Sequence, residues 1–325
     1  MDPFERARLG RTEVTVTRLG LGLAPIGGLY AAVGDEAARA TVRRAYDLGI
    51  GHFDTAPLYG SGLSERRAGS VLSTLPRDGF TLATKVGRRL AAAGGDGQDF
   101  WAEDSGERPV WDFSAEGTRR SYAESLERLG LERADVLHIH DPDDHFVDAM
   151  AGARPALVDL RAEGRIGAVS AGMNQSAMLA DFVRTGDFDC VLLAGRYTLL
   201  DQSGLAGLLP LCAERGTSVI CGGVYNSGIL ADPGAGARYN YAPAPASLVE
   251  RALAMRAVCE RHGVPLRAAA IQFPFGHPAV AGVVIGARSP AEVDDAVAMC
   301  SVEIPGALWA DLRATGLIPD GVPVP

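Results

Sequence analysis

The sequence predicts an α/β fold, a single closed (β/α)8 barrel of the TIM type over residues 1–325 with long loops on its catalytic face. Three observations lead to this prediction. Short apolar runs alternate with amphipathic stretches along the whole chain, which is typical of parallel strands joined by helical crossovers. Eight such runs occur, the number that closes a barrel. Two long irregular segments follow strands, where the loops of a catalytic face are expected.

The expected strands are all short and apolar. They are Leu19–Leu23, Ile50–Phe53, Thr81–Lys85, Val136–Ile139, Ile166–Ser170, Cys190–Leu193, Ser218–Cys221 and Gly282–Ile285. The expected helices have the apolar spacing of surface helices. They are Asp35–Leu48, Ser114–Leu129, Ala153–Glu163, Gln175–Thr185, Leu205–Arg215, Pro245–His262 and Pro290–Cys300. A doubly wound open sheet is the alternative, but it favours a GxGxxG motif after its first strand, and Gly20–Pro25 supplies only part of one.

Signals for helix ends support these boundaries. Ser64 precedes a short helix, and Ser114 precedes a long charged one. Glycines follow helix ends at Gly49, Gly130, Gly164, Gly216 and Gly263.

Three segments do not follow the strand–helix alternation: 87–113, 223–244 and 304–325. Long irregular segments in a compact domain are typically binding loops or disordered. Because the first two follow strands, we expect them over the active site, whereas 304–325 is expected to be a C-terminal tail.

Composition excludes several classes of protein. The net charge of −9 disfavours nucleic acid and anionic membranes as partners. Four arginine pairs are interpreted as solvated surface: Arg43-Arg44, Arg66-Arg67, Arg88-Arg89 and Arg119-Arg120. No apolar run is long enough to span a membrane, and the charged N-terminus resembles no secretory signal. Five cysteines without a CxxC pair indicate free thiols in the cytoplasm and no metal site. We expect a monomer or a small homo-oligomer.

Four reactive side chains stand at the ends of three successive strands. Asp54 and Tyr59 follow the second expected strand, Lys85 ends the third, and His140 ends the fourth. In a parallel barrel these ends converge on one rim. A phenol ordinarily titrates near ~10. The ammonium of Lys85 is expected to lower the pKa of Tyr59, and Asp54 is expected to hold Lys85. The sequence therefore predicts an acid–base site in which Tyr59 moves a proton and His140 orients a substrate oxygen.

Each residue also has a simpler interpretation. A single Tyr after a strand is more often an anchor, and a single Lys at a strand end is more often a surface charge. His138 and His140 point to the same side of their strand. His138 is disfavoured as the catalytic histidine only because it lies two residues before the strand end. It is the four reactive types at matching strand ends that favour catalysis.

With these motifs in view, the chain resembles the aldo-keto reductase superfamily over nearly its whole length. The resemblance is carried by Leu19–Gly22, Phe53–Gly60, Lys85, Asp135–His140, Arg165–Ser170 and Ile285–Pro290. It implies a (β/α)8 barrel that binds NAD(P) in an extended form, with Asp54, Tyr59, Lys85 and His140 as the catalytic tetrad.

The resemblance also implies cofactor contacts. Ser170 is expected at the carboxamide, with Asn174 in place of the amide that Ala171 lacks. Ala194 stands where a glutamine is common, and Gly222 stands where an aromatic residue usually stacks on nicotinamide, which leaves Tyr225 as a candidate. Ser227 and Gly228 are expected at the pyrophosphate.

Four residues near the end of the barrel bear on the choice of cofactor: Gly286, Arg288, Glu292 and Asp295. Members selective for NADP usually have basic groups in this segment. A carboxylate suits a ribose hydroxyl and repels a phosphate, whereas Arg288 could bind one. We expect NAD, with NADP open.

Within the superfamily the chain resembles the sugar-oxidising branch: L-fucose, D-threo-aldose 1- and L-galactose dehydrogenases, with pyridoxal 4-dehydrogenase close by. Residues 24–30, 58–65, 139–145, 170–175 and 222–230 carry this finer resemblance. It implies oxidation of the anomeric hydroxyl of a free aldose, of the L-fucose, L-galactose or D-arabinose type, to a lactone. Tyr30, Trp111 and Asp141 are the candidate substrate contacts. Trp101 is a further candidate to pack on a sugar, but we expect it rather to anchor its loop.

Four alternatives stay open. They are a pyridoxal 4-dehydrogenase, an NADPH-dependent reductase of small aldehydes or ketones, a lyase with a Schiff base at Lys85, and a nicotinamide-binding regulatory subunit with vestigial turnover.

Overall fold

The computed structural model describes residues 1–92, 101–103 and 105–325, and it contains a closed barrel of eight parallel strands. In barrel order these are β10 (Cys190–Ala194), β11 (Ser218–Gly222), β14 (Val280–Gly286), β3 (Leu19–Gly22), β4 (His52–Asp54), β5 (Thr81–Val86), β8 (Val136–His140) and β9 (Ala168–Met173). Each overlaps one predicted strand, so the predicted fold class is confirmed.

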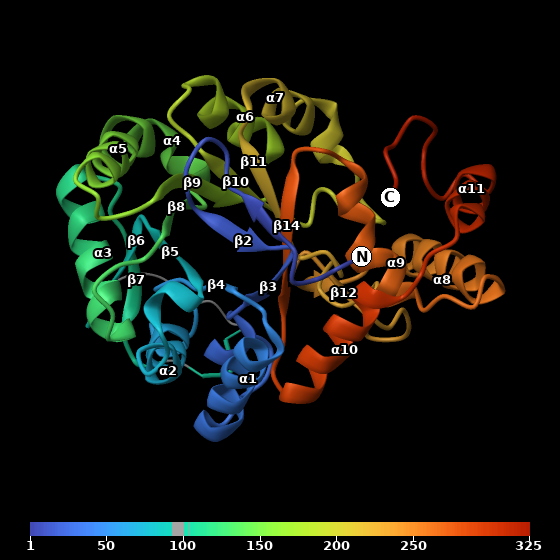
Figure 1. Ribbon diagram of the computed structural model, residues 1–325, viewed down its shortest axis with the longest axis horizontal. Helices are drawn as coiled ribbons and strands as arrows, with labels where there is room; N and C mark the ends of the chain where they lie inside the picture. The colour runs from blue at the N-terminus through green and yellow to red at the C-terminus, as the bar shows by residue number, and fades with distance from the viewer. Residues whose placement is uncertain (93–100, 104) are drawn as a thin grey trace.

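Helices surround this barrel (Figure 1). They are α1 (Asp35–Leu48), α2 (Leu63–Leu72), α3 (Ala115–Leu129), α4 (Phe146–Asp148), α5 (Arg154–Ala162), α6 (Ser176–Arg184), α7 (Leu208–Arg215), α8 (Ala246–Arg261), α9 (Leu266–Gln272), α10 (Pro290–Ser301) and α11 (Gly306–Ala314). Ser114 caps α3 as predicted, since its hydroxyl accepts the Gly117 N–H at 3.0 Å. Ser64 lies inside α2 instead of before it, and its hydroxyl donates to Leu23 O.

The barrel has an inner and an outer apolar core. The outer core packs the helices against the strands, and the inner core fills the barrel. Leu9 and Val16 belong to the inner core, where they meet the first residues of β8 and β9. They come from an antiparallel hairpin of β1 (Arg6–Arg8) and β2 (Thr15–Thr17). This hairpin closes the end of the barrel where the strands begin, so the opposite end is left for the site.

Two irregular segments contain small ribbons of their own. Segment 87–113 carries β6 (Arg88–Ala91) paired with β7 (Arg108–Trp111), and segment 223–244 carries β12 (Arg238–Tyr239) paired with β13 (Ala242–Pro243). The tail is not irregular throughout, because α11 buries Trp309. Among the described residues, no helix is long and apolar enough to cross a bilayer.

Candidate active site

The structure brings the four predicted catalytic side chains together at the rim where the strands end. Asp54 ends β4, Lys85 lies near the end of β5, and His140 ends β8. Lys85 Nζ donates to Asp54 Oδ1 and to Thr55 O, and it lies 4.9 Å from the centre of the Tyr59 ring. The His140 ring meets the Tyr59 ring edge-on, with centroids 5.9 Å apart. Tyr59, Lys85 and His140 line one cavity of about 210 Å³.

Two glycines fix the position of Tyr59. Gly60 has φ +60°, and a Cβ on it would lie 2.1 Å from Gly27 O. A Cβ on Gly27 would in turn lie 2.8 Å from the carbonyl carbon of Tyr59. The turn after β4 can therefore press against the turn after β3 only because both residues lack a side chain. Ser64 also stabilises the turn after β4, because its hydroxyl contacts Thr55 Oγ1 at 2.9 Å.

The electrostatics of the site agree with the predicted roles in part. Burial alone would raise the pKa of Asp54, but Lys85 and His138 outweigh it and hold that pKa well below its usual value. Asp54 is thus ionised and pairs with Lys85, which is only 2% exposed. A Schiff-base lysine must supply a neutral, accessible amine, so this pairing disfavours the lyase alternative.

The pKa of Tyr59 contradicts the expectation that Lys85 lowers it. Burial first, and then the charges of Asp54 and Asp141, raise the pKa of this phenol well above its usual value, against a lowering by Arg88. The reason is geometric, since the ammonium lies over the ring and its charge is already paired with Asp54. Burial also lowers the pKa of His140 well below its usual value, helped by Arg88. At neutral pH the site therefore holds a protonated phenol beside a neutral imidazole.

A paired charge that was not predicted faces this cavity. Arg88 was interpreted as solvated surface, yet it is 8% exposed and lines the cavity. Its Nη2 lies 2.8 Å from Asp141 Oδ2, which is also 3.5 Å from His140 Nε2. Asp141 adopts φ +39°, a left-handed conformation that Asp tolerates better than most residues. The carboxylate predicted to bind substrate is thus held between a guanidinium and the candidate catalytic imidazole.

The aromatic residues are arranged differently from the prediction. Trp101 lines the catalytic cavity, with its ring centre 5.7 Å from that of Tyr59, although loop anchoring was the favoured expectation for it. Trp111 is 49% exposed and packs on the outer side of Arg88, 4.3 Å from Cζ, and it is not among the residues that line the cavity. It therefore packs against Arg88 and lies outside the lining of the cavity. Tyr30 lines the neighbouring cavity described next.

A second cavity of about 630 Å³ adjoins the catalytic one, and Leu29 and Tyr241 line both. Seven of the predicted cofactor residues line it: Tyr225, Ser227, Gly228, Gly286, Arg288, Glu292 and Asp295. The Tyr225 hydroxyl is buried and has no hydrogen-bond partner among the described residues, as expected of a group that binds a ligand. The N–H of Gly228 donates to Tyr225 O at 3.0 Å. Of the two residues predicted to contact the pyrophosphate, Ser227 therefore remains the candidate.

The far end of this second cavity carries two paired arginines. Arg288 N donates to Glu292 Oε2 at 2.9 Å, and its guanidinium lies 3.6 Å from Glu292 Oε1. Arg267, which the sequence analysis missed, pairs with Asp295 at 2.8 Å. A Cβ on Gly286 would meet Pro25 Cγ at 2.6 Å, so no basic side chain fits at that position.

Ser170 does not reach either cavity, contrary to the prediction. It is fully buried, and its Oγ lies 2.7 Å from His138 Nδ1. The sheet register explains this, because Ser170 pairs with His138 while Gly172 pairs with His140, so the rim lies two residues further along β9. Asn174 does line the catalytic cavity, and its Nδ2 donates to Ala194 O.

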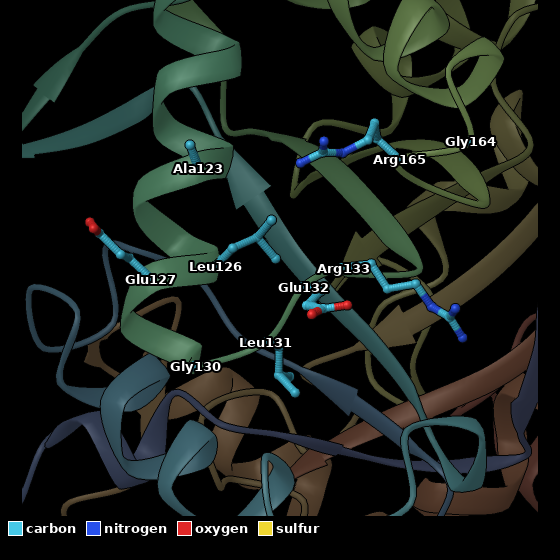
Figure 2. Close-up of a pocket in the computed structure, with 9 residues that line it drawn as sticks. All are labelled: Ala123, Leu126, Glu127, Gly130, Leu131, Glu132, Arg133, Gly164 and Arg165. Atoms are coloured by element: carbon cyan, nitrogen blue, oxygen red, sulfur yellow. The ribbon is translucent and has the colours of Figure 1, made fainter.

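Another hollow, of about 860 Å³, lies at the opposite end of the barrel (Figure 2). The last turns of α3 and the segments just before β8 and β9 line it, including Leu126, Arg133 and Arg165. None of the predicted site residues is among them. No group of three or more His, Cys, Asp or Glu in the described parts of the chain could hold a metal ion.

The fold and the site define a barrel oxidoreductase. Two adjoining cavities, one with a buried phenol and paired charges and the other with an acid–base cluster, suit a nicotinamide dinucleotide. The sequence profile of the Aldo/keto reductase family matches residues 18–316. The chain belongs to this family of NAD(P)-dependent enzymes.

Similar proteins agree on the class and differ in substrate. The chain is 44% identical to D-threo-aldose 1-dehydrogenase from a Pseudomonas species, over 94% of this chain and 96% of that one. It is 40% identical to pyridoxal 4-dehydrogenase from Microbacterium luteolum (97% and 98%) and 33% identical to L-galactose dehydrogenase from Arabidopsis thaliana (92% and 88%). A holo-form aldo-keto reductase from Bacillus halodurans shares the fold, with a TM-score of 0.77 at 24% identity over 98% of both chains.

Proposed function

We propose that this protein oxidises the anomeric hydroxyl of a free aldose, of the L-fucose, L-galactose or D-arabinose type, to its lactone with NAD. The observation that carries the proposal is the Arg88–Asp141 pair beside Tyr59 and His140 in the catalytic cavity. A sugar presents several hydroxyls, and each can donate to the carboxylate or accept from the guanidinium. The similarity to two sugar dehydrogenases supports the same substrate class.

The charge of the cavity favours a neutral substrate over an acidic one. An unpaired arginine would attract a sugar carboxylate, but Asp141 already neutralises Arg88 at 2.8 Å. An acidic sugar would have to displace this carboxylate and would bring a like charge beside it. The pair therefore offers polar contacts without net charge, as a neutral polyol requires.

The four catalytic residues would divide the reaction as follows. Tyr59 accepts the proton of the C1 hydroxyl, and the neutral His140 donates a hydrogen bond to the same oxygen. Lys85, held by Asp54, places a positive charge beside the phenol as it becomes phenolate. Nicotinamide supplies the acceptor for the hydride that leaves C1. The proton and the hydride together make up the two electrons and two hydrogens that separate a lactol from its lactone.

The paired arginines of the second cavity favour NAD over NADP. A 2′-phosphate near Arg288 and Arg267 would also meet Glu292 and Asp295, which already hold these guanidiniums. A ribose hydroxyl can donate to such a carboxylate, whereas a phosphate is repelled by it.

The test is a panel of L-fucose, L-galactose, D-arabinose and pyridoxal, each with NAD and NADP, followed by absorbance of the reduced cofactor. We expect turnover of at least one sugar, with NAD preferred. If no sugar reduces either cofactor, the aldose proposal is wrong.

Pyridoxal is the second candidate substrate, because one relative at 40% identity is a pyridoxal 4-dehydrogenase and Trp101 could stack on a pyridine ring beside Tyr59. Turnover of pyridoxal alone would favour it over the sugars.

All five cysteines are free and buried, which suits a reducing compartment, and we propose that the enzyme works in the cytoplasm.

A further inference from the structure

Two histidines of β8 point into the barrel, and they have different surroundings. His140 lines the catalytic cavity, whereas His138 is fully buried and is not among the residues that line it. The sheet register places Lys85, His138 and Ser170 side by side on β5, β8 and β9. His138 therefore lies two residues before His140 on the same strand and outside the lining of the catalytic cavity, which the longer Lys85 side chain reaches from the neighbouring position.

His138 connects Ser170 to the catalytic carboxylate. Its Nδ1 lies 2.7 Å from Ser170 Oγ, and its Nε2 lies 3.3 Å from Asp54 Oδ2. The other carboxylate oxygen, Oδ1, accepts from Lys85. The contact at 3.3 Å is imperfectly aligned, yet neither of its atoms has a hydrogen-bond partner elsewhere among the described residues. Because a buried polar atom without a partner costs free energy, this 3.3 Å contact is the interaction that can offset the cost at both atoms.

The direction of these hydrogen bonds follows from the chemistry of the groups. An ionised carboxylate only accepts, so His138 must present an N–H at Nε2. A neutral imidazole has a single N–H, so Nδ1 is then an acceptor and the Ser170 hydroxyl donates to it. Burial lowers the pKa of His138, which agrees with a neutral ring. Ser170 thus selects the ring tautomer that Asp54 needs.

We propose that His138 is a positioning residue of the catalytic site. Backed by Ser170, it holds the Asp54 carboxylate on the side opposite Lys85 and so fixes the Lys85 ammonium beside Tyr59. The inference rests on the proposed catalytic roles of Asp54, Lys85 and Tyr59, and it applies to any substrate that this site turns over.

The groups around His138 that can titrate come from four strands. Asp54 and His52 belong to β4, Lys85 to β5 and His140 to β8 itself, and Cys190 of β10 lies beyond Ser170. Asp54 is the single acid in this set. It is therefore the group whose ionisation a change at His138 will alter most.

The first test reads the tautomer directly and needs no substrate. Imidazole nitrogen NMR of the protein labelled at its 6 histidines, with H138Q to identify the missing signals, reports which nitrogen carries the proton. We expect a neutral His138 with its proton on Nε2 between pH 6 and 9, and a shift of the equilibrium towards Nδ1–H in S170A. A proton on Nδ1 in the native protein, or a charged ring at pH 7, would overturn the proposal.

The second test separates positioning from folding. Rates are measured with the fastest substrate of the panel or, if no sugar reacts, by reduction of an aromatic aldehyde with NADH, so a wrong sugar assignment does not affect this test. We expect H138L to lower kcat about 10- to 100-fold with little change in KM, because a displaced Lys85 affects the reacting geometry more than binding. With a sugar as substrate, the rise of kcat for oxidation should also move to higher pH by one unit or more, because a displaced Lys85 stabilises the Tyr59 phenolate less.

The conservative variant and a distant histidine complete the comparison. The H138Q side-chain amide can still donate to Asp54, so at least part of the lost kcat should return. H277Q, a buried histidine outside both cavities, should keep native kcat. Native kcat in H138L, or equal losses in H138L and H138Q at similar thermal stability, would show that His138 is structural only.

Discussion

Lys85 Nζ lies 4.9 Å from the centre of the Tyr59 ring and directs its hydrogen bonds to Asp54 and Thr55. The ammonium is therefore a fixed charge that faces the phenol from one side, and Asp54 prevents it from turning away. Burial first, and then the charges of Asp54 and Asp141, raise the pKa of Tyr59, and Lys85 does not offset them because Asp54 already pairs with its charge. Lys85 therefore acts mainly by stabilising the Tyr59 phenolate that forms during the reaction. It does not keep Tyr59 deprotonated before the reaction.

Removal of the phenol hydroxyl isolates the proton transfer. Tyr59→Phe should lower kcat about 10²–10⁴-fold, because the ring still fills its place but no group can exchange the substrate proton. The affinity for cofactor, measured by quenching of tryptophan fluorescence, should stay within about twofold. A variant that keeps native kcat would contradict the proposed role.

The direction of catalysis should determine how the rate depends on pH. The pKa of Tyr59 is raised, so the phenol stays protonated through neutral pH and only a small fraction is phenolate. Oxidation needs the phenolate and should accelerate steadily from pH 7 to 10, whereas reduction needs the phenol and should change little over this range. Initial rates in both directions in one buffer series measure this. Oxidation that is fastest near pH 6 would disagree.

Asp141→Asn should change the substrate preference. Without its carboxylate partner, Arg88 keeps an unpaired charge in the catalytic cavity. The KM for a neutral aldose should rise about tenfold, and the KM for the corresponding uronate should fall. The exposed neighbour Asp144→Asn serves as the control and should leave both constants unchanged. Parallel losses for both sugars would show that Asp141 does not discriminate by charge.

The choice of cofactor depends on Glu292. Glu292→Gln removes the charge that pairs with Arg288, so the guanidinium can bind a 2′-phosphate. We expect the ratio of kcat/KM for NADP to that for NAD to rise about tenfold. The exposed pair between Arg261 and Asp311 lies outside the lining of both cavities, so Asp311→Asn should leave the ratio unchanged. A native enzyme that prefers NADP would overturn the premise.

The buried histidines should make the folded protein sensitive to acid. Burial lowers the pKa of His52 from its usual 6.5 to about 4. Between these values the unfolded chain binds a proton that the folded protein rejects, so the free energy of unfolding falls as pH falls from 6.5 to 4. The loss is about 1.4 kcal/mol per pH unit for one such group, and above pH 6.5 there is none.

His52→Leu should weaken this dependence, whatever it does to stability at pH 7. The measurement is the urea midpoint at pH 7 and pH 5, and the half-buried His262→Gln is the control. Identical shifts of the midpoint in native protein and His52→Leu would show that His52 does not titrate in this range.

The sequence determined the barrel and the catalytic cluster for one physical reason. The apolar periodicity of each strand depends on its own residues, and parallel strands in a barrel must bring their ends to one rim. Asp54, Tyr59, Lys85 and His140 could therefore be placed together without a structure. The helix α11 was missed because it is short and a proline-rich end follows it.

Only the tertiary structure decided which neighbouring side chains belong to the site. Ser170 and His138 have the right residue types and nearly the right positions, but the sheet register places them one layer too deep. Arg88 looked like a solvated charge because nothing local shows that β6 pairs with β7 and brings Trp111 against it. Contacts of this kind join residues far apart in the chain, so their distances depend on how strands and loops pack and not on any local pattern.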